Sequence, residues 1–125
     1  MTKAVIVGGG IGGLTTAIAL RRIGVDAVVL EKAGELREIG AGISLWVNAM
    51  KALERLGLDA TVRAVGQEEI GGKICLSGGK TLSEIPADAL EERFGRNVVL
   101  QRPDLQRVLL AALDEAGGVV RLGAG

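Results

Sequence analysis

Residues 7–13 read Val7-Gly8-Gly9-Gly10-Ile11-Gly12-Gly13 and contain the pattern G-x-G-x-x-G as Gly8, Gly10 and Gly13. Gly8 permits a tight turn from a strand into a helix, and Gly13 lets that helix pack close to a sheet. Gly10 lacks a side chain, so the backbone there can approach a pyrophosphate group. The pattern alone is weak evidence, because glycine-rich turns are common. Its meaning depends on the residues on either side.

The flanking residues predict a βαβ unit. Ala4-Val5-Ile6-Val7 is a continuous apolar run, typical of a strand buried on both faces of a parallel sheet. From Ile11 to Ile23 apolar residues recur at helical spacing, and Gly24 can end that helix. Ala27-Val28-Val29-Leu30 then repeats the signature of a buried strand. The order strand, helix, strand over about thirty residues is that of a βαβ unit.

Glu31 directly follows the second predicted strand. A carboxylate at this point can accept hydrogen bonds from ribose hydroxyls, and it disfavours a 2′-phosphate. The N-terminus of the first helix would meet the phosphates, because its free N–H groups and its dipole favour an anion. The combination predicts a dinucleotide site. The alternative is a tight turn followed by a solvated glutamate.

The rest of the chain predicts further helices and strands of an α/β fold. Residues 32–42 are polar and glycine-punctuated, which indicates a loop. Asn48 is predicted to cap a helix that ends at Gly57 and whose inner face consists of Ala49, Ala52, Leu53 and Leu56. A hairpin is predicted from Ile70–Leu76 and Lys80–Leu82, with its turn at Ser77-Gly78-Gly79. The remaining predicted elements are a helix over Asp88–Phe94, a strand over Val98–Leu100, a helix from Pro103 to Ala116 and a strand that begins at Val119.

Composition excludes several classes of function. The 125 residues hold 15 basic and 15 acidic side chains with no basic run, which argues against nucleic acid and against an anionic membrane surface. The chain has no histidine and one cysteine, Cys75, which excludes the usual zinc sites and any Ser-His pair. A single cysteine cannot form a disulfide within the chain, which fits a reducing cytoplasm. No stretch of the sequence approaches the length of a membrane span. Redox chemistry would therefore have to come from a cofactor.

Four segments carry a resemblance to a known family: Val5–Glu31, Glu35–Ile43, Asn48–Leu58 and Arg102–Leu105. Together they resemble the flavin-dependent aromatic hydroxylases, the single-component FAD monooxygenases related to p-hydroxybenzoate and salicylate hydroxylases. The more specific parts are the Gly-Ala-Gly-Ile run that ends at Ile43 and the Arg-x-x-Leu helix start. The resemblance implies FAD as cofactor, NAD(P)H as electron donor, and O₂-dependent hydroxylation of a small aromatic substrate.

The resemblance also implies which residues contact FAD. The glycine turn would meet the pyrophosphate, Glu31 the adenosine ribose, and Arg37 the adenosine and phosphate side. The segment 41–43 would run beside the flavin, and Arg102 would contact FAD from its helix start. The simpler alternatives are surface arginines and loop glycines without a ligand. The full set of candidate cofactor-binding residues is Gly8, Gly10, Ile11, Gly12, Gly13, Glu31, Lys32, Arg37, Ala41, Gly42, Ile43 and Arg102. No residue is identified as a catalytic acid or base.

Members of that family are much longer than this chain. Residues 1–125 therefore resemble the N-terminal portion of an FAD-binding domain in a truncated form, with residues 68–100 resembling the start of a substrate-domain insertion. We expect at most weak FAD affinity, no hydroxylation by this chain alone, and self-association through exposed apolar strands. Two alternatives are another FAD-dependent oxidoreductase and a non-catalytic module that binds NAD or FAD. The long stretch between Glu31 and the predicted hairpin argues against an NAD module.

Overall fold

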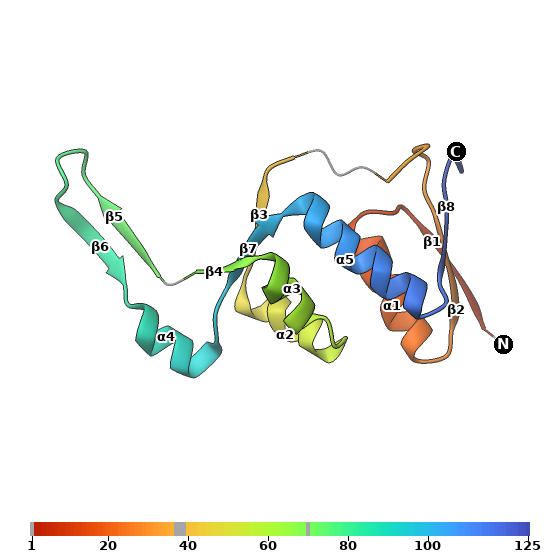
Figure 1. Ribbon diagram of the computed structural model, residues 1–125, viewed down its shortest axis with the longest axis horizontal. Helices are drawn as coiled ribbons and strands as arrows, with labels where there is room; N and C mark the ends of the chain where they lie inside the picture. The colour runs from red at the N-terminus through yellow and green to blue at the C-terminus, as the bar shows by residue number, and fades with distance from the viewer. Residues whose placement is uncertain (1, 37–39, 70) are drawn as a thin grey trace.

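The computed structural model describes residues 2–36, 40–69 and 71–125. They form a mixed α/β fold with a parallel sheet, an antiparallel sheet and a separate hairpin (Figure 1). In chain order the elements are β1 (Lys3–Val7), α1 (Ile11–Arg22), β2 (Asp26–Leu30), β3 (Gly42–Leu45), α2 (Val47–Arg55), α3 (Asp59–Val65), β4 (Gln67–Glu68), β5 (Gly72–Cys75), β6 (Thr81–Ile85), α4 (Ala87–Phe94), β7 (Val98–Gln101), α5 (Arg102–Glu115) and β8 (Val119–Arg121).

The predicted βαβ unit is present. β1 and β2 run parallel, β8 joins the far side of β2, and the sheet order is β1-β2-β8. Helices α1 and α5 lie side by side over the same face of this sheet (Figure 1). Their facing residues Leu14, Ile18 and Leu109 have no exposed surface. Burial of such side chains stabilises the fold by about 1.5–3 kcal/mol each.

The prediction that β1 is buried on both faces is wrong for the described chain. Val5 is 59 % exposed and Val7 is 87 % exposed, although Ile6 between them is half-buried. The cause is that Ile6 packs against the core and lies beside Gly13 of α1, whereas Val5 and Val7 alternate with it and point to the other face of the sheet. Figure 1 draws no helix over that other face. A run of apolar residues cannot show which of its faces is covered.

The antiparallel sheet has the order β3-β7-β4. Gly42 pairs with Gln101 at one end of the β3–β7 ladder, and Leu45 pairs with Val98 at the other. Neither β3 nor α3 nor β4 was expected from the sequence. The helices α2 and α3 bury Met50 and Val62 against the core. The strand β3 was not predicted because its first residues belong to a glycine-rich segment, which is typical of a loop.

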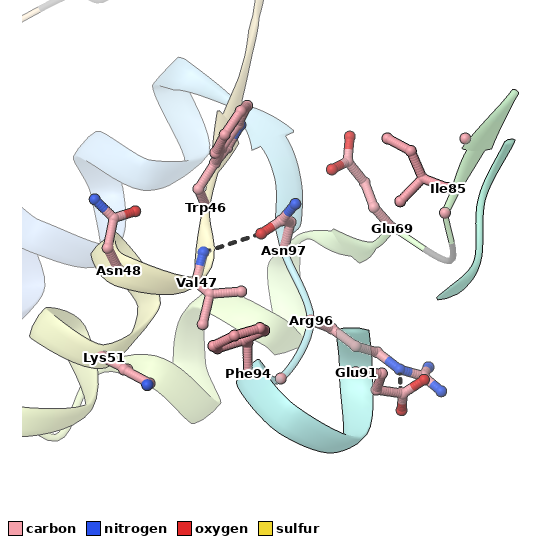
Figure 2. A pocket seen from close by; sticks show the side chains of 13 residues that line it. Trp46, Val47, Asn48, Lys51, Glu69, Ile85, Glu91, Phe94, Arg96 and Asn97 are labelled. Atoms are coloured by element: carbon pink, nitrogen blue, oxygen red, sulfur yellow. Dashed lines mark hydrogen bonds and ion pairs between the residues drawn. The ribbon is translucent and has the colours of Figure 1, made fainter. Parts of the chain in front are cut away.

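The prediction that Asn48 caps α2 is also wrong. The helix begins at Val47, its N-cap is Trp46, and Trp46 makes no capping hydrogen bond with its side chain. Instead Asn97, which immediately precedes β7, accepts a hydrogen bond through Oδ1 from the Val47 N–H at 2.9 Å (Figure 2). The helix is therefore capped by Asn97, which is far away in sequence. Asn48, which the sequence suggested as the cap, lies inside the first turn of the helix.

The predicted hairpin is present as β5 and β6, and with α4 it projects away from the two sheets (Figure 1). We call residues 71–96 the arm. At its base the Glu69 N–H donates to the Asn97 carbonyl oxygen at 3.0 Å. Arg96 pairs with Glu91 at 2.5 Å and with Glu68 at 3.0 Å, and these hydrogen bonds, Glu91 first, raise the pKa of the Arg96 guanidinium. A charged Arg96 thus joins α4 to β4.

None of the helices in the described ranges is both long enough and apolar enough to cross a lipid bilayer.

Candidate functional site

The turn between β1 and α1 is fastened to the end of β2. Gly8 has φ of 106°, a left-handed conformation that glycine adopts readily and other residues avoid. Its N–H donates to the carbonyl oxygen of Leu30 at 2.7 Å. The turn therefore lies at the carboxyl ends of β1 and β2, the edge at which parallel sheets of this kind place their ligands.

Gly13 brings the first turn of α1 against β1, as the sequence predicts. A Cβ built on Gly13 would overlap the carbonyl oxygen of Gly8, and it would lie 3.4 Å from Cγ2 of Ile6. Any larger residue would push the helix away from the strand. The position thus needs glycine for close packing, independently of any ligand.

The N-terminus of α1 is open to an anion. Its N-cap is Gly10, which offers no side-chain acceptor, and no acidic residue stands in its first turn. The first N–H groups of a helix have no partner within that helix. A Cβ built on Gly10 or on Gly12 would meet no atom within 4 Å. These N–H groups and the free space beside them fit a pyrophosphate, so the residues present suit a dinucleotide.

Gly9, which the motif leaves unspecified and the sequence analysis did not single out, is a further glycine on which the packing of this turn depends. It is buried, and a Cβ built on it would lie 2.8 Å from Cδ2 of Leu36 and 3.3 Å from Cβ of Glu31. The absence of a side chain at Gly9 allows the segment after β2 to close against the turn. Its place in the middle of the run Gly8-Gly9-Gly10 was the only signal in the sequence.

Glu31 stands beside this turn. Its N–H donates to the carbonyl oxygen of Arg121 at 2.9 Å, and its carbonyl oxygen accepts from the Ala124 N–H at 2.9 Å. The backbone at Glu31 is therefore held between the glycine turn and the segment after β8. Within the described residues the half-buried carboxylate has no hydrogen-bond or ion-pair partner. It is free to accept hydrogen bonds from a ligand.

A second group of candidate residues meets at β3 and the start of α5. Gly42 and Ile43 lie in β3, opposite Gln101 and Leu100 of β7. Arg102 follows directly as the first residue of α5, and a Cβ built on Gly40 would lie 3.9 Å from its Cδ. The structure thus brings Arg102 beside the glycine-rich segment that contains the exposed Ala41.

A small apolar cavity lies between the starts of α1 and α5. It has a volume of about 200 Å³ and reaches from the start of α1 to the start of α5, where Ile11, Thr15 and Leu105 line it together. The glycine turn and the Arg102 helix start are therefore neighbours in space. The structure does not bring the last two candidates into either group. Lys32 is exposed, and Arg37 lies outside the described residues.

The described residues contain no group of three or more His, Cys, Asp or Glu side chains that could hold a metal ion.

Comparison with known proteins identifies the family. The model of the family described as "FAD binding domain" matches residues 1–124. Aurachin C monooxygenase/isomerase of Stigmatella aurantiaca is 44 % identical over 105 residues, which cover 83 % of this chain and 27 % of that protein. The 3-hydroxybenzoate 6-hydroxylase of Klebsiella oxytoca is 40 % identical over 113 residues, covering 88 % of this chain and 28 % of that protein.

Solved structures agree with this result. A variant of Klebsiella pneumoniae HpxO complexed with FAD superimposes with a TM-score of 0.84 at 30 % identity, and the match covers 98 % of this chain and 31 % of that one. This chain therefore spans about a third or less of the length of the relatives named here. The resemblance drawn from the sequence is confirmed, and so is FAD as the cofactor of the family. The chain belongs to the FAD binding domain family, and it corresponds to the N-terminal part of the flavin-dependent aromatic hydroxylases.

Proposed function

We propose that the β1–α1 turn binds the ADP half of FAD. The observation that carries the proposal is the open N-terminus of α1, with no side-chain cap and no acid in its first turn. It lies beside the carboxylate of Glu31, which has no partner within residues 2–36, 40–69 and 71–125. The backbone N–H groups of Ile11, Gly12 and Gly13 would donate to the pyrophosphate. Glu31 would accept from the adenosine ribose. In this proposal β1, the glycine turn, α1 and β2 form a Rossmann-like dinucleotide-binding unit.

The flavin half would extend toward β3 and α5. Ala41, Gly42 and Ile43 would border it, while Arg102 and Arg37 would supply positive charge to the phosphates, and Lys32 would add charge at the adenosine end. The small cavity, which Ile11 and Leu105 line together, supports this direction because it places the starts of α1 and α5 next to each other. Bound FAD would supply electron transfer from NAD(P)H and the activation of O₂.

For the whole protein we propose an NAD(P)H-consuming monooxygenase of the cytoplasm that hydroxylates a small aromatic molecule. Support comes from the names of the relatives, which include a 3-hydroxybenzoate 6-hydroxylase and an FAD-dependent urate hydroxylase. Residues 68–100 would begin the substrate domain, since most of them belong to the arm, residues 71–96, which stands apart from the sheets (Figure 1). The 125-residue chain would bind FAD weakly and would not hydroxylate unaided.

We also propose that the 125-residue chain self-associates. The support is the uncovered face of the parallel sheet, where Val5, Val7 and Val119 are each more than half exposed. Exposed apolar strands pair readily with other chains. Light scattering over a range of protein concentrations tests this, and a constant monomer mass would contradict it.

Calorimetric titration with FAD, FMN and NAD tests the nucleotide site. The wild-type chain should bind FAD more tightly than FMN, because FMN lacks the adenosine. Glu31→Ala should weaken FAD binding by about tenfold, the value of one or two hydrogen bonds to a charged acceptor. The matched control is Glu54→Ala, an exposed acid of α2, which should leave binding unchanged. Tighter binding of NAD than of FAD, or equal effects of the two substitutions, would contradict the proposal.

A further inference from the structure

The arm, residues 71–96, stands outside the hydrophobic core. Among the described residues, the buried core and the apolar side chains packed on it include none from the arm. The hairpin carries apolar side chains of its own, and Ile74, Leu82 and Ile85 are each more than half exposed. Figure 1 shows the arm projecting away from both sheets. The described side chains of the arm therefore do not fix its position by packing against the core.

A glycine in a left-handed conformation stands at each end of the arm. Gly71 has φ of 109° and Gly95 has φ of 90°. Each lies two residues outward from the hydrogen bond between Glu69 and Asn97 that closes the base of the arm. A Cβ built on Gly95 would meet no atom within 4 Å, so the space around this backbone is open. Small residues at the ends of a segment commonly serve as hinges, because they absorb large changes of φ and ψ.

One ion pair crosses the hinge at Gly95. Glu91 lies in α4, on the arm side of this glycine, and its carboxylate accepts from Nε of Arg96 at 2.5 Å. Arg96 is itself held to the body, because its guanidinium also pairs with Glu68 of β4 at 3.0 Å. Glu91 and Arg96 are each about one third exposed, so water and salt weaken their attraction. The pair is therefore a weak restraint on the position of the arm.

A cavity of about 740 Å³ separates the arm from the start of α2. Trp46 lies on the wall formed by the start of α2 and is 67 % exposed, while Ile85 lies on the wall formed by the arm (Figure 2). The arm can turn into this open space, and contact between the two walls would remove apolar area from water. Closure thus gains hydrophobic burial and loses the restraint that Glu91 provides.

We propose that the arm is a hinged lid. It turns about Gly71 and Gly95 and closes toward the start of α2, so that Ile85 of β6 covers Trp46. The structure represents the open position, in which the ion pair of Glu91 holds the arm away from α2. The lid controls access to the large cavity. Neither position involves the glycine turn between β1 and α1, so the inference does not depend on FAD binding.

The chain carries its own pair of reporters across the hinge. Trp46 is the only tryptophan and there is no tyrosine, while Cys75 is the only cysteine. Cys75 lies in β5 of the arm and is exposed, so a thiol-reactive acceptor dye attached to it reports its distance from Trp46 by energy transfer. Lid motions are much slower than tryptophan emission. Compared with the unlabelled chain, the labelled chain should therefore show two populations, one for the open and one for the closed arm.

The closed population should rise several-fold between low salt and 1 M NaCl, because salt screens the ion pair of Glu91. Glu91→Gln should produce the same rise at low salt and should remove most of the dependence on salt. Glu92→Gln is the matched control, since Glu92 is the exposed neighbour of Glu91 in α4, and it should behave as wild type. Quenching of Trp46 by neutral acrylamide in the unlabelled chain checks the result, because closure should protect Trp46.

A second pair of variants identifies the contact that closes the lid. Ile85→Ser removes apolar area from the arm wall of the cavity and should lower the closed population at every salt concentration. Leu82→Ser is the control, because Leu82 lies in the same strand and is similarly exposed but stands outside the cavity wall. It should leave the closed population unchanged. Circular dichroism confirms that each variant is folded before it is compared.

Three results would overturn the proposal. A single transfer efficiency that is equal at low and high salt, in wild type and in Glu91→Gln, would show that the arm is fixed. Equal effects of Ile85→Ser and Leu82→Ser would show that the arm does not close on Trp46. Energy transfer that disappears when the labelled chain is mixed with an excess of unlabelled chain would show that the dye approaches Trp46 of a second copy.

Discussion

The side-chain oxygen of Asn97 lies 2.9 Å from the backbone nitrogen of Val47 and accepts its hydrogen bond. This contact satisfies the first N–H of α2, which Trp46 at the N-cap leaves without a side-chain acceptor. Asn97 also closes the base of the arm through its backbone carbonyl. Asn97 thus holds both the start of α2 and the base of the arm in place.

Asn97→Ala should destabilise the protein by about 1 kcal/mol, the usual cost of removing a helix cap. The hydrogen bond from Glu69 remains, because it uses the backbone of Asn97. Asn48→Ala is the control, since the amide of Asn48 does not cap α2, and it should change stability by less than about 0.5 kcal/mol. Urea unfolding followed by circular dichroism measures both. Equal losses would show that the Asn97 side chain does not act as the cap.

Gly13→Ala should unfold the βαβ unit or cost about 3 kcal/mol, because the new Cβ would overlap the Gly8 carbonyl oxygen. Gly12→Ala separates packing from binding. Its Cβ meets no atom within 4 Å, and alanine favours a helix over glycine by up to about 1 kcal/mol. We therefore expect Gly12→Ala to be at least as stable as wild type but to bind FAD less tightly. Thermal unfolding and FAD titration of the two variants check this, and a loss of stability in Gly12→Ala would disprove it.

Arg21→Met should destabilise the protein by about 1–2 kcal/mol. The Arg21 guanidinium donates to the Ala116 carbonyl oxygen at 2.9 Å and to Asp26 at 2.8 Å, so it joins α1 to α5 and to β2. A cation at the end of α5 is also favoured by the helix dipole. The neighbouring Arg22→Met replaces an exposed arginine and should cost less than about 0.5 kcal/mol. If chemical denaturation gave the same midpoint for both variants, the bridging role of Arg21 would be refuted.

Arg96→Met should destabilise the arm at low salt, because Arg96 pairs with both Glu91 and Glu68. All three side chains are about one third exposed, so salt should weaken these pairs as the screening length falls to about 3 Å at 1 M. The difference between variant and wild type should therefore shrink in 1 M NaCl. Lys73→Met is the control, since the ion pair of Lys73 with Glu84 spans 3.8 Å and is more exposed. Proteolysis at the arm under both salt conditions gives the measurement, and a salt-independent difference would count against an electrostatic role.

The sequence was sufficient for the parts of the fold that depend on local patterns. The glycines at positions 8 and 13 require a turn and a close approach, and both are present. The helix of the βαβ unit and the helix predicted from Pro103 to Ala116 follow from apolar spacing, and they are present as α1 and α5. These features could be predicted because the cause and the effect lie within a few residues of each other.

What the sequence could not show depends on contacts between distant segments. Asn97 caps a helix that begins fifty residues earlier, and no local pattern distinguishes it from Asn48. Val5 and Val7 have the composition of buried residues, yet their exposure depends on where α1 and α5 pack. In the candidate site, the closeness of Glu31 to Gly9 and of Arg102 to Gly40 arises from the same kind of long-range packing.

The hydrogen bond between Glu69 and Asn97 means that the arm leaves and re-enters the body at a single point. A segment closed in this way can change in length or composition at the cost of one loop closure, without altering the register of β3 with β7. The segment beside Arg102 and the start of α2 would stay in place while the arm is replaced. The cavity of about 740 Å³ between the start of α2 and the arm then has one constant wall and one exchangeable wall.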